Sequence, residues 1–158
     1  MSANPSDTVR LTRLIRAPRE KVYQAFVDPE VIRRWWRCEP DWSCPSCAID
    51  ATTGGAYRTS MADPQGKPFT VFGEFLELDP PNRLRFSWNW EHAPEFGAQS
   101  VVTVEFYETV FDDQPATELV LTHERLNTPH ERSEHTIGWM GGLGSLAAYF
   151  HTHTSVTA

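Results

Sequence analysis

The chain has 158 residues and a formal net charge of −7, and 40% of its residues are hydrophobic while 12% are aromatic. This length predicts one domain, and the apolar content suffices for a packed core and excludes a disordered chain. Because nucleic acids and anionic membranes both attract basic surfaces, the acidic balance without any Lys or Arg run argues against either as a partner.

No apolar run is long enough to span a membrane, and the first residues lack the basic and apolar regions of a secretory signal. The three cysteines are an odd number, which is typical of free thiols in a reducing compartment. We therefore expect a cytoplasmic protein. The sequence contains no phosphate-binding loop, G-x-S-x-G or H-E-x-x-H motif, and we expect no cofactor.

The first part of the chain predicts one strand and two short helices. After a tail over residues 1–7, the alternation over residues 8–16 predicts a strand. A helix is expected over residues 18–27, and a second runs from Asp28, as its cap, to about Trp36. Two short helices bury little surface alone, so we expect them in the concavity of a curved sheet.

The middle of the chain has a two-residue period. A loop rich in Trp, Cys and Pro covers residues 37–46, and another loop ends at about residue 98. Between turns marked by Gly and Pro, the pattern predicts successive strands. Their expected ranges are 47–51, 56–61, 69–78, 83–90, 100–109 and 117–124. Gly73 predicts a bulge or bend inside its strand.

The last stretch, residues 128–150, predicts one long helix. Thr128 and Glu131 form a capping-box pair, and an apolar stripe follows at helical spacing. That stripe consists of Trp139, Leu143, Leu146 and Phe150. Glycines at 138, 141, 142 and 144 each cost a helix about 1 kcal/mol. They are explained by close approach to a neighbour, by a kink, or by space left unfilled.

Together these elements predict an α+β fold. Successive strands joined by short turns are antiparallel neighbours, so about seven strands form one sheet with the helices on one face. We expect the sheet to curve around the long C-terminal helix, which closes a hollow.

The order of elements and five segments resemble the family of activator of heat-shock-protein-90 ATPase homologues, which belongs to the helix-grip superfamily. The segments are RLIRAPREKVYQAFVDPEVIRRWW (13–36), AIDATTGGAYRTSM (48–61), GEFLELDPPNRLRFSW (73–88), TELVLTHERL (117–126) and IGWMGGLGSL (137–146). The resemblance covers nearly the whole chain and implies a helix-grip fold with a cavity between the long helix and the sheet. It names no single ligand, because this fold carries binders, co-chaperone domains and enzymes.

The residues expected to converge between sheet and helix are mostly aromatic, as in a small-molecule pocket. The candidate ligand-binding residues are Trp36, Tyr57, Met61, Phe72, Phe86, Trp88, His123, Trp139 and Leu143. The competing interpretation is a solid core in which these side chains only fill space. Phe72 depends on strand register, because both faces of its strand are apolar.

His123, with Tyr57, is the only candidate catalytic pair, since an imidazole can act as a general base. A buried structural histidine is the alternative. His135 lies one helical turn before Trp139, and it faces either the mouth of the pocket or, as we expect, solvent. Of the adjacent Trp35 and Trp36, one helix cannot direct both inward. One therefore forms an exposed partner-binding patch, or Trp36 plugs the end of the cavity under residues 37–46.

Cys44 and Cys47 have C-x-x-C spacing, and Cys38 precedes them. Such spacing occurs in redox centres and in half of a zinc site. Because no helix or second ligand pair follows, we expect ordinary thiols.

Three functions follow. The first is binding of a small hydrophobic or amphipathic ligand. The second is a co-chaperone of the heat-shock-protein-90 ATPase, which the resemblance implies; the chain leaves no room for a second domain. The third is a cyclase or hydratase acting through His123 and Tyr57. The sequence fits a monomer or a homodimer.

Overall fold

The computed structural model describes residues 7–93 and 99–155. Most of the predicted tail (1–7) and of the predicted loop ending at residue 98 lies outside them. The elements in chain order are β1 (Val9–Ile15), α1 (Arg19–Gln24), α2 (Pro29–Trp35), β2 (Ser43–Ile49), β3 (Ala56–Ala62), β4 (Pro68–Asp79), β5 (Arg83–Trp90), β6 (Ser100–Phe111), β7 (Gln114–Glu124) and α3 (Pro129–Ser155).

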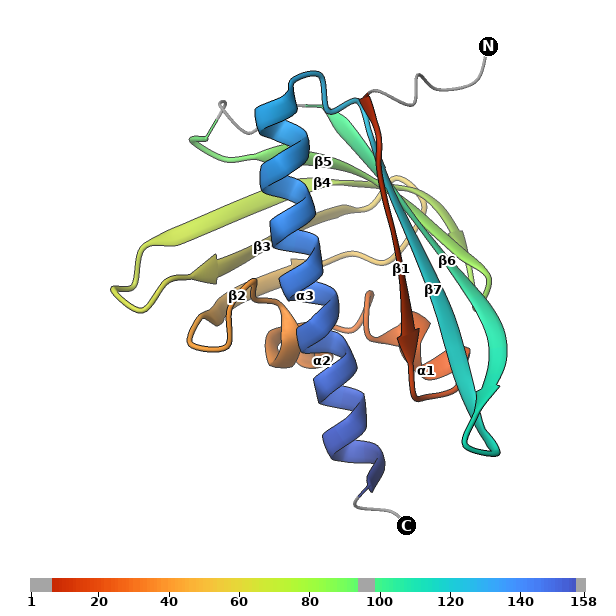
Figure 1. Ribbon diagram of the computed structural model, residues 1–158. Coiled ribbons are helices and arrows are strands. Elements are labelled where there is room, and N and C mark those ends of the chain that lie inside the picture. Colours follow the sequence, from red (N-terminus) through yellow and green to blue (C-terminus); the bar gives the residue numbers. More distant parts are fainter. Residues whose placement is uncertain (1–6, 94–98, 156–158) are drawn as a thin grey trace.

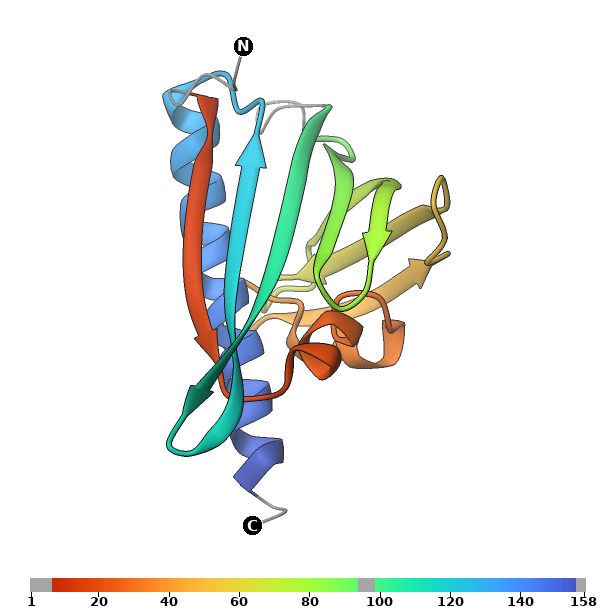
Figure 2. The same cartoon turned by 90° about the vertical axis from the view of Figure 1, so that its right-hand side faces the viewer.

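The strands form one seven-stranded antiparallel sheet in the order β1-β7-β6-β5-β4-β3-β2. The sheet curls, and α3 crosses its concave side (Figure 1). The helices α1 and α2 lie together at one end of the curl (Figure 2). This arrangement confirms the predicted α+β helix-grip fold.

The long helix begins as the capping box predicts. Thr128 Oγ1 accepts from Glu131 N at 3.1 Å. The Glu131 carboxylate accepts in return from Asn127 N at 3.1 Å, rather than from the Thr128 amide. The predicted stripe of Trp139, Leu143, Leu146 and Phe150 is buried. The helix continues to Ser155 instead of ending at residue 150.

Several strands extend beyond their predicted ranges, most clearly β2, β6 and β7. In β2, a register shift between Ser43 and Ser46 lets Ser43 pair with Ala62, so the strand begins before residue 47. The β6–β7 ladder extends to the pair Phe111–Gln114. Asp112 and Asp113 have φ values of 54° and 61°, as a two-residue type I′ turn requires.

In the described residues, no helix has the length and apolar character to cross a bilayer.

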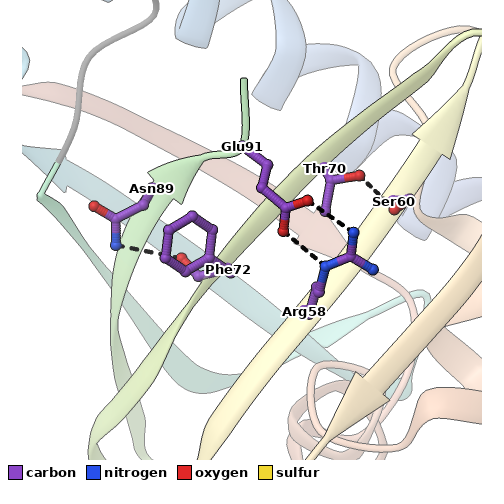
Figure 3. Close-up of polar contacts among 6 residues, drawn as sticks. All are labelled: Arg58, Ser60, Thr70, Phe72, Asn89 and Glu91. Atoms are coloured by element: carbon purple, nitrogen blue, oxygen red, sulfur yellow. Dashed lines mark hydrogen bonds and ion pairs between the residues drawn. The ribbon is translucent and has the colours of Figure 1, made fainter. Parts of the chain in front are cut away.

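Phe72 lies on the outer face of the sheet, so its predicted inward orientation is wrong. Its register partners are Arg58 and Asn89, and 41% of its surface is exposed. Figure 3 places it beside the ion pair of Arg58 and Glu91, whose closest atoms are 2.7 Å apart. The irregularity of β4 falls after Phe75 rather than at Gly73, so no bulge reverses the face of Phe72.

Candidate functional site

A partly open hollow lies between α3, the segment after α2, and the neighbouring ends of β3, β4 and β5. Its volume is about 290 Å³. It is lined by Trp36, Arg37, Cys38, Glu39, Trp42, Met61, Phe69, Trp88, Trp90, Glu134, His135, Ile137, Gly138, Trp139 and Gly142. Pockets for drug-sized ligands measure about 300–1,000 Å³, so the hollow suits a molecule of one or two rings. We call it the tryptophan cavity, because five of the chain's six tryptophans line it.

Two pairs of tryptophan rings around the tryptophan cavity meet edge to face. Trp36 and Trp139 are 5.8 Å apart between centroids with an interplanar angle of 84°. Trp88 and Trp90 are 5.7 Å apart, also at 84°. Edge-to-face pairs are favourable arrangements of aromatic rings. The walls are therefore held by ring-on-ring packing rather than by loose side chains.

Trp36 reaches this wall because it ends α2. It is the C-cap, with φ −72° and ψ 89°, so it has left the helical path that Trp35 still follows. Trp35 is fully buried and donates its indole N–H to the Ala25 carbonyl at 2.9 Å. Trp36 is 8% exposed. Both rings are thus inside, which excludes the alternative in which one of them forms an exposed patch.

His135 is buried at the cavity wall, against our expectation of an exposed position. Trp90 Nε1 donates to its Nε2 at 2.9 Å, and an indole N–H can only donate. The other ring nitrogen, Nδ1, therefore carries the proton and donates to the Glu131 carbonyl. Burial lowers the pKa of His135, so the ring is neutral near pH 7. Helix geometry predicts that the Glu131 carbonyl lies near His135, but nothing in the sequence predicts the bond to the Trp90 indole.

His123 is fully buried and takes part in a second series of hydrogen bonds that also begins at a tryptophan. Trp139 Nε1 donates to its Nδ1 at 3.0 Å, which leaves the proton on Nε2. Nε2 donates to Ser100 Oγ at 2.8 Å, and Ser100 Oγ donates to the Trp88 carbonyl at 3.2 Å. Burial, aided by the nearby His135, lowers the pKa of His123 well below its usual value. Both nitrogens are occupied, as in a structural histidine.

Tyr57 belongs to another part of the interior. Its hydroxyl donates to the Ser87 carbonyl at 2.6 Å, and burial raises its pKa well above the usual value. Tyr57 and Phe86 line a separate void of only about 30 Å³, which holds no more than a water or two. The hydrogen bonds of Tyr57 and His123 thus run to different partners. The main hollow is displaced from Tyr57 towards the N-terminal half of α3.

The structure therefore divides the predicted site residues into groups. Those at the tryptophan cavity are Trp36, Met61, Trp88 and Trp139. Those of the filled interior are Tyr57, Phe86, His123 and Leu143, and Phe72 lies outside. Wall residues that the sequence did not single out include Trp42, Phe69 and Trp90. The predicted loop over residues 37–46, which is rich in Trp, Cys and Pro, was the signal in the sequence that could have pointed to Trp42.

Two glycines of α3 have different reasons to be glycine. A Cβ at Gly141 would overlap with the backbone carbonyl of Cys38, so this position needs close approach. A Cβ at Gly138 would have no neighbour within 4 Å, and Gly138 lines the tryptophan cavity. Two of the explanations offered for the glycine-rich helix therefore hold at once, each at its own position.

The three cysteines are free thiols, and burial raises the pKa of each. Cys44 Sγ lies 3.8 Å from Thr59 Oγ1. Among the described residues, no group of three or more His, Cys, Asp or Glu side chains could hold a metal ion.

Residues 16–151 match the family described as "Activator of Hsp90 ATPase homolog 1-like protein". The chain belongs to this family. A search of curated proteins found no match.

Solved structures resemble the chain over most of its length. Protein CV1439 of Chromobacterium violaceum is 26% identical, with a TM-score of 0.75, covering 91% of this chain and 97% of that one. The AHSA1 protein of Silicibacter pomeroyi is 22% identical, with a TM-score of 0.75 and coverage of 92% and 99%. The Plasmodium falciparum protein PFC0360w, described as an HSP90 activator, is 24% identical, with a TM-score of 0.64 and coverage of 86% and 89%.

Proposed function

We propose that this protein binds a small, mainly apolar molecule in the tryptophan cavity. The observation that carries the proposal is the contrast between the two voids on the concave side. One is filled to about 30 Å³, while the other remains at about 290 Å³ and gathers five of six tryptophans. Protein interiors normally pack without voids much larger than a water molecule, so an aromatic hollow of this size that opens to solvent has the anatomy of a ligand site.

The expected affinity is modest. A one-ring ligand that buries about 200 Å² of apolar surface gains roughly 5 kcal/mol at 25 cal/mol per Å². The cavity wall loses a comparable apolar area, and association costs part of this sum. A dissociation constant between about 1 µM and 1 mM is therefore the range to search.

The test uses 4-tert-butylphenol, an uncharged one-ring molecule, followed by saturation-transfer NMR and isothermal calorimetry. Replacing Gly138→Leu puts a side chain into the cavity, where a Cβ meets nothing within 4 Å. We expect at least about a tenfold loss of affinity in this variant. Met140→Leu is the matched control, because Met140 lies two residues on, is 60% exposed and does not line the cavity. Equal binding by both variants would refute the proposal.

Native mass spectrometry of protein purified from its own host provides a second test. A retained natural ligand would appear as added mass on the intact chain. We expect Gly138→Leu protein from the same host to lack that mass and Met140→Leu protein to keep it. Added mass on Gly138→Leu would place the ligand elsewhere.

A second candidate is regulation of the Hsp90 ATPase. It is supported by family membership over residues 16–151 and by the description of the Plasmodium protein as an HSP90 activator. The test is the ATPase rate of the host's own chaperone with and without micromolar protein. Stimulation would support this role, and an unchanged rate would remove it. A cytoplasmic location agrees with the three free thiols, and a reporter fusion in the host would test it.

A further inference from the structure

Most indole N–H groups of the tryptophan cavity are either bonded to a neighbour or buried within the wall. Trp90 and Trp139 give their indole N–H groups to the two histidines. The indole nitrogens of Trp36 and Trp88 are buried in the wall, with no accessible surface and no partner among the described residues. Four of the five indoles therefore present carbon and π surface to the cavity rather than an N–H group.

Several other donors at the wall are also bonded. His135 donates through Nδ1 to a helix carbonyl. The guanidinium of Arg37 uses three of its five N–H groups, donating to Ser145 Oγ at 3.3 Å and to the backbone carbonyls of Trp42 at 3.4 Å and Arg34 at 3.0 Å. An anion or a carbonyl oxygen entering the cavity would therefore find few donors to replace its hydration, chiefly the partly buried Trp42 indole and the remaining N–H groups of Arg37.

Acceptors and negative potential remain available. Glu39 lines the cavity from the segment after α2, and Glu134 lines it from α3. Two carboxylates thus line the cavity beside one guanidinium, that of Arg37, while the Lys67 ammonium lies near Phe69 without lining the cavity. Aromatic faces are also negative, and rings that meet at 84° form the corners of an aromatic box. Phe69 of the same wall already has the Lys67 ammonium 5.2 Å from its ring centroid.

We propose that the tryptophan cavity binds a hydrophobic organic cation: a quaternary ammonium or protonated amine attached to an apolar body of about one ring. The positive group lies against the indole faces within reach of Glu39 and Glu134, and the apolar body fills the rest of the cavity. The chain's net charge of −7 favours approach of cations. This inference rests on the proposed function, because it specifies the ligand of the same cavity.

The test compares three molecules that share a phenol ring and differ only in the para group. They are (4-hydroxyphenyl)trimethylammonium, its uncharged carbon isostere 4-tert-butylphenol, and the anion 4-hydroxybenzenesulfonate. Isothermal calorimetry near neutral pH measures all three with the full chain. We expect the cation to bind at least about tenfold more tightly than the isostere, and the anion to bind least.

Charge variants separate the rim carboxylates from the rings. Glu134→Gln and Glu39→Gln should each weaken cation binding about three- to tenfold and leave 4-tert-butylphenol unchanged. Both side chains are exposed at the rim, so folding is not at risk. Glu20→Gln is the control, since it removes the same charge from an exposed position on α1 that does not line the cavity. We expect it to bind the cation as the parent does.

The outcomes distinguish this inference from the proposed function. If 4-tert-butylphenol binds as tightly as the cation and Gly138→Leu abolishes both, the cavity binds ligands but the inference of a cation is wrong. If none of the three molecules binds, both proposals are wrong. Equal weakening by Glu20→Gln and Glu134→Gln would reduce the effect to net charge and overturn the placement at the rim.

Discussion

Gly138 and Gly141 allow the packing of α3 to be tested with one methyl group at each of two neighbouring positions. Alanine is favoured over glycine inside a helix by about 0.5–1 kcal/mol. At Gly138 the new Cβ meets nothing within 4 Å, so Gly138→Ala should be more stable by about that amount. At Gly141 the Cβ overlaps with the Cys38 carbonyl oxygen, a backbone atom that cannot rotate away.

Overpacking of this kind costs about 1–3 kcal/mol, which outweighs the gain in helix propensity. The two alanine variants should therefore differ by about 2 kcal/mol in free energy of unfolding, measured by urea titration with tryptophan fluorescence and circular dichroism. For a chain of this size the difference corresponds to roughly 4–8 °C in Tm. A Gly141→Ala variant as stable as Gly138→Ala would refute the close approach of α3 to the segment after α2.

Three further predictions concern side chains of the interior and the outer face. His123→Phe leaves the Trp139 indole and the Ser100 hydroxyl without their imidazole partner, so it should lower the free energy of unfolding by about 3 kcal/mol. A loss below about 1 kcal/mol in urea titration would contradict the hydrogen bonds from Trp139 through His123 to Ser100. Because the pKa values of His123 and His135 are lowered in the folded state, the unfolded chain binds more protons in acid. The free energy of unfolding should therefore be constant above about pH 6.5 and fall below it by up to about 1.4 kcal/mol per pH unit and histidine. A flat profile from pH 8 to 5 would contradict the buried neutral rings. Phe72→Ser on the exposed outer face should change stability by less than about 1 kcal/mol and leave binding of 4-tert-butylphenol unchanged, whereas a large effect on binding would return Phe72 to the site.

The fold could be predicted from the sequence because its signals are local. Alternating apolar residues give the strands, and the capping box with its apolar stripe gives α3. The differences from the predicted strand ranges have no clear signal in the sequence. The register shift in β2 and the two aspartates of the β6–β7 turn are stabilised by pairing across strands, which no single segment encodes.

The position of the cavity could not be read in the same way. Whether Tyr57 and Phe86 border a hollow or a filled core depends on which side chains fill the space beside them, and Trp35 and Trp36 line the small void that remains there. The non-helical C-cap that turns Trp36 inward has no marker in the sequence. The pairing of two tryptophans with two histidines joins residues far apart in the chain, so its effect on ring orientation appears only in three dimensions.

The lining of the tryptophan cavity is the physical basis for proposing an organic ligand. The cavity opens to solvent at a rim where Glu39 and Glu134 are exposed, so water enters it. Release of water from apolar walls is favourable, and water is held firmly only where two to four polar groups can bond it. Here the indole N–H groups of Trp90 and Trp139 are bonded to imidazoles, and those of Trp36 and Trp88 are buried without accessible surface. The carboxylates lie at the rim. A molecule that brings apolar surface, and a positive charge for the rings, matches what the wall still offers.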